Sequence, residues 1–164
     1  MQLSETRKML IPFSEIVLAT LDVNQVATRV GAVAEYILIK HYSWSKNGDI
    51  GNEKGYDAFD LDGKKHEIKG MSYESKTNYV AYSHDSKGGK YDFLTILHFN
   101  EKRVASIPQF EIDNFFKHNT LPGRKSKTLR LNFNDPLLTI LGKPRKKSLF
   151  QALFLKYEDK NFTF

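Results

Sequence analysis

The segment 55–70 constrains this chain more than any other, because its sequence is typical of two short strands joined by a tight turn. It places one acid, Asp57, on the first strand and the acid-x-base triplet Glu67-Ile68-Lys69 on the second. Whether these groups can meet depends on the register in which the two strands pair.

The length of the turn decides that register. A two-residue loop, Asp62-Gly63, would place Ile68 opposite Asp57 and leave Glu67 on the other face. A three-residue loop that begins one residue earlier places Glu67 opposite Asp57. In that loop Gly63 occupies the left-handed position of a type I turn with a bulge. We expect the three-residue loop, which makes Lys69 the diagonal neighbour of Asp57.

Two carboxylates that face each other on adjacent strands repel, so Asp57 and Glu67 call for a cation between them. These carboxylates and the main-chain carbonyl of Ile68, completed by water and a phosphate oxygen, suit Mg²⁺. Such an ion lowers the pKa of a bound water and stabilises charge on a phosphodiester under attack. Lys69 would add a positive charge beside the attacking water. The residues therefore predict a site that cuts nucleic acid.

The same residues resemble the motif of the PD-(D/E)xK nuclease superfamily, in which Tyr56 stands where the motif usually has Pro. The residues that narrow the resemblance to small homodimeric, PvuII-like type II restriction endonucleases are Asp57-Ala58, Asp60, Gly63 and Glu67-Ile68-Lys69. The resemblance implies a Mg²⁺-dependent phosphodiesterase. In it, Asp57 and Glu67 are metal ligands and Lys69 assists the nucleophile.

An acid-x-base triplet alone is weak evidence, since the chain contains it at Glu67/Lys69, Glu74/Lys76 and Glu158/Lys160. Only the first follows a hairpin turn and has an acid on the preceding strand. The alternative is a charged, solvated hairpin face.

Glu35 lies in a segment that we expect to be a helix, starting at Asp22 or Asn24 and reaching about residue 41. The apolar residues at helical spacing are Val26, Val30, Val33, Ala34, Ile37 and Leu38. In nucleases of the resembling kind, an acid on this helix helps to hold the metal or the lysine. The alternative is a residue on the helix flank that faces solvent.

The remaining pattern predicts an α/β fold with a restriction-endonuclease-like mixed β-sheet flanked by helices, in a single domain. The expected elements are a helix at 9–21, a loop at 43–54, strands at 92–99, 103–107 and 129–133, and helices at 108–116 and 149–157. On the helix at 108–116, the residues expected to face the sheet are Phe110, Ile112, Phe115 and Phe116. We divide this nuclease domain into N-terminal helices and loop (1–54), catalytic sheet core (55–116) and basic DNA-contacting part (117–164). The terminal segment 161–164 is expected to dock on the body or on a second subunit.

The segment 71–90 is rich in hydroxyl, amide, aromatic and basic side chains, which can contact base edges in the major groove of DNA. In the resembling endonucleases this region recognises bases and includes a His, for which His84 is the candidate here. We expect His84, Lys87 and Lys90 to contact DNA; the alternative is an ordinary polar strand and turn.

The net charge of +6 is concentrated in one part of the chain. Residues 117–147 contain nine Lys or Arg and a single acid, so the rest of the chain has a net charge of −2. This distribution suits a polyphosphate partner. We expect DNA backbone contacts from Arg124, Lys125, Lys127 and Arg130, with a solvated charged face as the alternative.

The chain has no cysteine, which excludes disulfides, thiolate metal sites and a cysteine nucleophile, and is compatible with the cytoplasm, where we expect it. The apolar run at 9–21 is interrupted by Pro12, Ser14 and Glu15. It is therefore typical of neither a signal peptide nor a membrane span.

These inferences predict a Mg²⁺-dependent endonuclease that cuts double-stranded DNA, as a homodimeric type II restriction enzyme. One active site per chain cuts one strand, so a double-strand cut requires two copies. The alternatives are a junction-resolving or repair nuclease of the same superfamily and a DNA-binding module without catalysis.

Overall fold

The computed structural model describes residues 29–47, 56–71, 79–82, 91–119, 127–131, 133, 139–140, 143–144 and 146–163. The helix expected at 9–21 and most of the polar segment 71–90 lie outside these residues.

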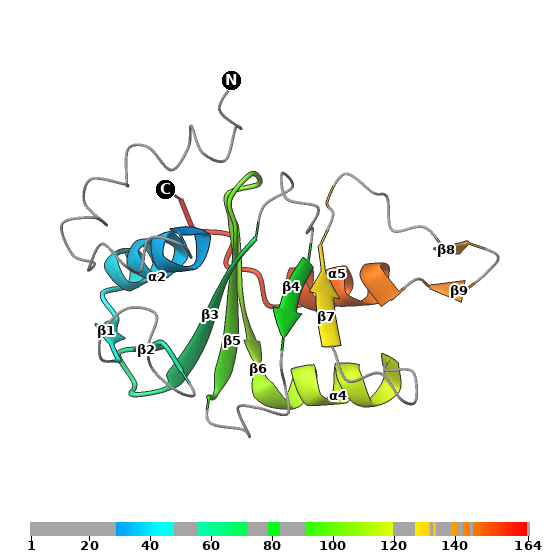
Figure 1. Ribbon diagram of the computed structural model, residues 1–164, viewed down its shortest axis with the longest axis horizontal. Coiled ribbons are helices and arrows are strands. Elements are labelled where there is room, and N and C mark those ends of the chain that lie inside the picture. Colours follow the sequence, from blue (N-terminus) through cyan, green and yellow to red (C-terminus); the bar gives the residue numbers. More distant parts are fainter. Residues whose placement is uncertain are drawn as a thin grey trace.

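A five-stranded mixed sheet forms the centre of the molecule, with strand order β1-β2-β3-β5-β6 (Figure 1). Its strands are β1 (Ser45–Lys46), β2 (Ala58–Phe59), β3 (Lys65–Met71), β5 (Phe93–His98) and β6 (Arg103–Pro108). β3 and β5 pair in parallel, and the other neighbours pair antiparallel. The described helices are α2 (Arg29–Tyr42), α4 (Gln109–Asn119) and α5 (Lys146–Lys156). The expected α/β fold with a mixed sheet and flanking helices is confirmed.

Two short ribbons accompany the sheet. β4 (Tyr79–Tyr82) pairs with β7 (Lys127–Arg130), and β8 (Thr139–Ile140) pairs with β9 (Lys143–Pro144). The strand expected at 129–133 begins two residues earlier and ends at Arg130, after which Leu131 is fully buried.

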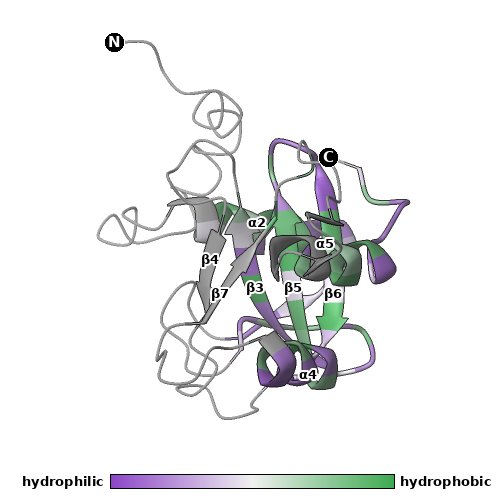
Figure 2. Cartoon of the chain, turned by 90° about the vertical axis from the view of Figure 1, so that its right-hand side faces the viewer, coloured by the Kyte–Doolittle hydropathy of each residue, from purple (hydrophilic) through white to green (hydrophobic). Residues whose placement is uncertain are grey.

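Two apolar clusters cover the two faces of the sheet. On one face α2 packs on Ala58, Ile68, Leu97, Phe99 and Val104. On the other face α4 and α5 pack on Met71, Leu94, Ile96, Ala105 and Ile107. Figure 2 shows α4 and α5 on one side of the sheet, in front of β5 and β6, which carry many apolar residues.

The α2 helix buries the face that its sequence predicts. Val33 and Ile37 are 3% and 5% exposed, and Ala34 and Leu38 are fully buried. Its last turn ends at Tyr42, followed by Ser43 with a φ of 55°. Directly after it, Trp44 packs on this cluster and β1 joins the edge of the sheet, where the sequence indicated only a loop.

β5 is the buried strand that the apolar run at 92–99 predicts, and β6 returns beside it after a short turn. One expectation for α4 is wrong: Phe110 does not face the sheet and is 61% exposed, whereas Ile112 and Phe116 are buried. The reason is geometric, because two residues correspond to about 200° of helix rotation and Phe110 lies on the side away from Ile112.

The C-terminal segment docks on the body of the same chain. Phe162 is 6% exposed and lies in the cluster under α2. Arg103 makes two hydrogen bonds to the carboxylate of Glu158, at 2.5 and 2.8 Å, and Tyr42 donates one of 2.6 Å to Asp159. These contacts tie the end of the chain to β6 and α2.

The turn between β2 and β3 has the three-residue loop that we expected. Phe59 pairs with Lys65, and the Asp60 N–H donates to the Lys64 carbonyl at 2.9 Å, which leaves residues 61–63 as the loop. Gly63 has a φ of 76° and its N–H donates to the Asp60 carbonyl at 3.1 Å. The predicted register of the hairpin is confirmed.

The two glycines with described surroundings should respond to alanine with opposite signs. Gly63→Ala strains a left-handed position and should lower the free energy of unfolding by roughly 1–2 kcal/mol. Gly31→Ala, inside α2 where an added Cβ meets nothing within 4 Å, should raise it by roughly 0.5–1 kcal/mol. Urea denaturation measures both. Equal and same-signed effects would contradict the turn conformation described here.

Candidate active site

Asp57 and Glu67 meet just before β2 begins. The pairing of Ala58 with His66, continued by one residue, brings Asp57 beside Glu67. The Asp57 N–H donates to the His66 carbonyl at 2.7 Å, and Asp57 Oδ2 accepts the Ile68 N–H at 2.6 Å. The carboxylate of Asp57 therefore accepts the Ile68 N–H in the way that a main-chain carbonyl of a paired strand would. These two hydrogen bonds fix the position of Asp57 beside β3.

Glu67 and Lys69 form an ion pair on β3. Lys69 Nζ donates to Glu67 Oε1 at 2.5 Å, and the Glu67 side chain is fully buried while that of Lys69 is 28% exposed. Residues two apart on a strand share a face, which brings the two charges together. A buried carboxylate requires such a partner, since an unpaired buried charge costs several kcal/mol.

Glu35 belongs to a charged cluster with Asp57, Glu67 and Lys69. It is 8% exposed on α2, so the alternative of a solvent-facing flank residue is wrong. Burial, followed by the negative charge of Asp57, raises the pKa of Glu35 to about 7, against a smaller lowering by Lys69 and Lys46. Glu35 on α2 therefore lies within electrostatic reach of Asp57, which directly precedes β2, and of Glu67 and Lys69 on β3.

Lys46 is a residue of this cluster that the sequence did not indicate. It lies on β1 opposite Ala58, and the neighbouring Asn47 N–H donates to the Asp57 carbonyl at 2.9 Å. A two-residue edge strand leaves almost no sequence pattern. Only the Lys itself, in a polar segment just before the hairpin, could have drawn attention to it.

His66 is the second residue that the sequence did not indicate. It is 3% exposed, its ring lies 4.0 Å from that of Trp44, and it stacks on Phe93. Its ring nitrogens contact Thr95 Oγ1 at 2.8 Å and Asp60 Oδ2 at 3.2 Å. Burial lowers the pKa of His66 below its ordinary value. In the sequence, the only sign that His66 could matter is that it directly precedes Glu67. On a strand, this position turns the His66 side chain to the face opposite to that of Glu67.

The residues present fit Mg²⁺, which keeps several water ligands, better than they fit a metal ion whose ligands are all protein side chains. Among the described residues, no three His, Cys, Asp or Glu side chains are arranged to hold a metal ion. Mg²⁺ usually takes one or two carboxylates and keeps several waters, which matches Asp57 and Glu67 with the Ile68 carbonyl. Burial is the largest cause of the raised pKa of Glu35, and the negative charges of Asp57 and Glu67 add to it.

The predicted DNA-contacting residues are only partly within the described residues. His84, Lys87, Lys90, Arg124 and Lys125 lie outside them. Lys127 and Arg130 lie in β7, in the register that pairs them with Tyr82 and Tyr79 of β4. The chain thus brings part of the basic segment and part of the polar segment together on one two-stranded ribbon.

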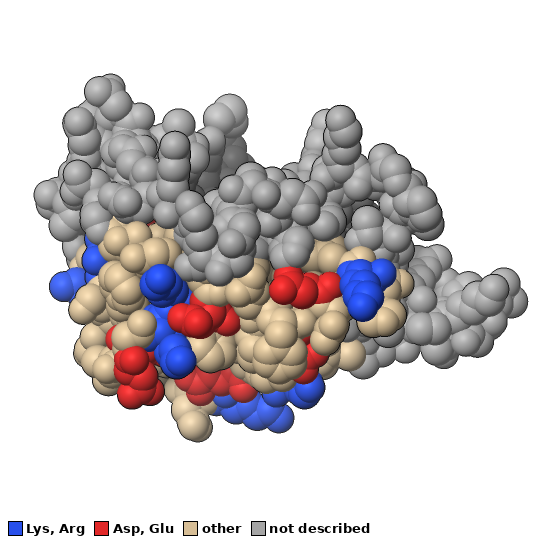
Figure 3. Space-filling view, turned by 90° about the horizontal axis from the view of Figure 1, so that it is seen from below, with Lys and Arg blue, Asp and Glu red and all other residues tan. Residues whose placement is uncertain are grey.

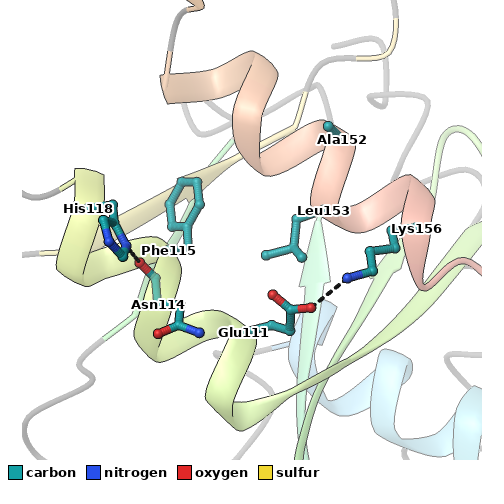
Figure 4. Close-up of a pocket in the computed structure, with 7 residues that line it drawn as sticks. All are labelled: Glu111, Asn114, Phe115, His118, Ala152, Leu153 and Lys156. Carbon is teal, nitrogen blue, oxygen red and sulfur yellow. Dashed lines mark hydrogen bonds and ion pairs between the residues drawn. The ribbon is translucent and has the colours of Figure 1, made fainter.

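A shallow groove of about 400 Å³ between α4 and α5 lies apart from this cluster (Figure 4). Its lining residues are Glu111, Asn114, Phe115, His118, Ala152, Leu153 and Lys156. Glu111 is already engaged there by Lys156 Nζ and the Tyr157 hydroxyl, each at 2.7 Å. None of the predicted site residues lines the groove, and we assign it no role in catalysis.

The described surface seen from below mixes both signs of charge. In Figure 3 the Lys and Arg side chains alternate with Asp and Glu, so this part of the described surface shows no single-sign patch. No helix among the described residues is long and apolar enough to cross a membrane.

Comparison with known proteins gives a loose structural resemblance. No family model and no curated protein matches the chain. Among solved structures, it is similar to the bacterial homing endonuclease I-Ssp6803I, with a TM-score of 0.45 and 20% identity over 78% of this chain and 88% of that chain. Since both values are low, we base the function on the residues of this chain alone.

The pKa of Glu35 makes a prediction for stability. A carboxyl whose pKa rises on folding contributes stability below its unfolded pKa of 4.5 and loses it as the pH rises through about 7. Glu35→Gln should therefore gain stability over the native chain with increasing pH, by on the order of 3 kcal/mol between pH 4 and pH 8. Urea denaturation across that range measures the difference. A difference that does not change with pH would contradict the buried position of Glu35.

Proposed function

We propose that this chain is a Mg²⁺-dependent endonuclease that hydrolyses phosphodiester bonds of double-stranded DNA. The observation that supports it is the gathering of Asp57, Glu67 and Lys69 at the open end of a bulged hairpin, within electrostatic reach of Glu35. This is the constellation of the PD-(D/E)xK motif, with carboxylates for a metal and a lysine for the nucleophile.

Asp57, Glu67 and the Ile68 carbonyl would hold the ion, which when bound supplies an activated water and charge stabilisation at the phosphate. The chain's own residues supply the rest. The Ile68 N–H fixes the orientation of the Asp57 carboxylate. Lys69 holds Glu67 in place and, when a cation shares that carboxylate, can turn its ammonium toward the attacking water. Glu35 adds negative charge that favours retention of a divalent cation.

The charge distribution of the chain supports DNA as the proposed substrate. Nine Lys or Arg against one acid in residues 117–147 suit a phosphate backbone. The β4–β7 ribbon carries Lys127 and Arg130 of that segment, and a two-stranded ribbon can enter a major groove. His84, Lys87, Lys90, Arg124 and Lys125 are proposed to continue the DNA contacts outside the described residues.

The finer proposal is a type II restriction enzyme that acts as a homodimer. One cluster of Asp57, Glu67 and Lys69 per chain cuts one strand, so a double-strand cut needs two copies, and twofold symmetry suits a palindromic target.

A plasmid incubated with the protein and Mg²⁺, and in parallel with EDTA, tests the proposal. Discrete fragments that disappear in EDTA are expected for a restriction enzyme. A smear or a nick would indicate a nuclease of the same superfamily without base specificity, such as a repair enzyme. DNA that stays intact while it is bound would leave a DNA-binding module and contradict the proposed reaction.

Isosteric changes in the triad should separate chemistry from folding. Asp57→Asn, Glu67→Gln and Lys69→Met should each lower the rate of cleavage at saturating DNA by at least about 100-fold. DNA affinity should change little in all three variants. The urea midpoint should change little in Asp57→Asn and Glu67→Gln but fall in Lys69→Met, which removes the ammonium that neutralises the buried Glu67 carboxylate. Lys64→Met, an exposed lysine in the same hairpin, is the matched control and should cleave normally. Near-native cleavage by any two of the three triad variants would exclude this metal site.

Neutralising Arg124, Lys125, Lys127 and Arg130 to Gln should weaken binding to all DNA sequences alike. The slope of log affinity against log salt should become shallower by roughly one unit for each phosphate contact removed. Neutralising the exposed residues Lys40, Lys64, Lys102 and Lys160 is the charge-matched control. If both quadruple variants have the same slope, the basic residues form a solvated charged face and do not contact the DNA backbone.

A further inference from the structure

A chain of side-chain hydrogen bonds crosses the sheet beneath α2 and ends at the hairpin turn. Ser106 on β6 contacts Thr95 on β5 at 2.9 Å, Thr95 contacts His66 Nδ1 at 2.8 Å, and His66 Nε2 contacts Asp60 Oδ2 at 3.2 Å. Thr95 is fully buried and His66 is 3% exposed. Four side chains from three strands and one turn are therefore connected, with the two middle ones, Thr95 and His66, buried and the two end ones, Ser106 and Asp60, partly exposed.

The chemistry of these groups gives the hydrogen bonds one direction. The Asp60 carboxylate can only accept, so His66 Nε2 carries the proton and Nδ1 of the neutral ring accepts from the Thr95 hydroxyl. The Thr95 oxygen then accepts from the hydroxyl of Ser106. Every donor has an acceptor in this arrangement, as a buried polar network requires.

Asp60 connects this network to the turn. Its Oδ1 accepts the N–H groups of Asp62 and Lys64, at 2.9 and 2.8 Å, while Oδ2 accepts from His66. One carboxylate thus holds both the loop conformation and the side chain of β3. The loop length is the feature that brings Asp57 beside Glu67.

His66 also contacts the site through its main chain. Its carbonyl accepts the Asp57 N–H at 2.7 Å, and the next residue along β3 is Glu67. A shift or rotation of residue 66 therefore moves both acids. Because alternate residues point to opposite faces, His66 does this from the face of the sheet opposite to that of Glu67.

We propose that His66, anchored by Asp60 and Thr95, is a positioning residue that sets the distance between the two acids Asp57 and Glu67. It makes no contact with substrate and acts through the backbone of the hairpin. The inference deepens the proposed function, on which its metal-binding part rests.

The test compares His66→Phe with His98→Phe. Phe can keep the ring contacts to Trp44 and Phe93 but not the two hydrogen bonds. His98 is a fully buried His on β5 that lies on the other face of the sheet, against Phe133, so its replacement controls for the loss of a buried imidazole. His66→Gln, whose amide can still donate to Asp60, is the conservative rescue variant.

Two quantities are compared between the native chain and the three full-length variants. The first is amide hydrogen exchange of Ile68, whose N–H is bonded to Asp57 Oδ2. It should become faster by on the order of tenfold in His66→Phe, as for a weakened buried hydrogen bond, and stay near native in the other two variants. The second is Mn²⁺ affinity by electron paramagnetic resonance, which should fall by roughly 10–100-fold in His66→Phe alone.

The outcomes separate the inference from the proposed function. Native exchange of Ile68 in His66→Phe overturns the positioning role whatever the metal result, and so does an equal increase in His66→Phe and His98→Phe. If the native chain binds no Mn²⁺, the metal site fails while the exchange measurement still decides the role of His66. Faster exchange with unchanged Mn²⁺ affinity would overturn the link between His66 and the metal ligands.

Discussion

The conformation of the β2–β3 turn is the constraint on which the candidate site depends. A side-chain period of two means that a loop shorter by one residue would leave Glu67 on the other face of the sheet from Asp57. Gly63 permits the left-handed residue that the longer loop needs, and Asp60 accepts two N–H groups inside it. The local chemistry of five residues therefore decides whether Asp57 and Glu67 can act together.

Given that register, the electrostatics of the site follow from burial. Glu67 is fully buried with Lys69 as its partner. Burial on α2 and the negative charge of Asp57 both raise the pKa of Glu35. A protein gains no stability from crowding acids in this way, since burial and like charge both oppose ionisation. Groups whose pKa values are perturbed by burial and a specific neighbour gather at functional sites more often than elsewhere. A divalent cation would offset the negative charges of Asp57, Glu67 and Glu35. The arrangement that costs stability in the free chain would therefore favour binding of the metal that the proposed reaction needs.

The sequence predicted the parts that local rules determine. The hairpin register followed from turn chemistry, and β5, β6 and the buried face of α2 followed from apolar periodicity. Phe110 was wrongly placed because the prediction grouped the apolar residues of the helix without using the rotation of about 200° that separates Phe110 from Ile112. Lys46 and the network of His66 were missed because they depend on an edge strand of two residues and on a contact between positions 66 and 95, which no local pattern records. Glu35 was named from resemblance, and only the packing of α2 shows that it is buried beside Asp57.

The central claim is that this hairpin register creates a binding site for one divalent cation. Anomalous X-ray diffraction from crystals of the native chain soaked in Mn²⁺ tests it most directly, because it locates the ion instead of inferring it from activity. The account predicts one strong peak per chain within bonding distance of the carboxylates of Asp57 and Glu67 and the carbonyl of Ile68, and no peak there in Glu67→Gln crystals. Crystals in which Mn²⁺ binds elsewhere, or in which the peak persists in Glu67→Gln, would contradict it.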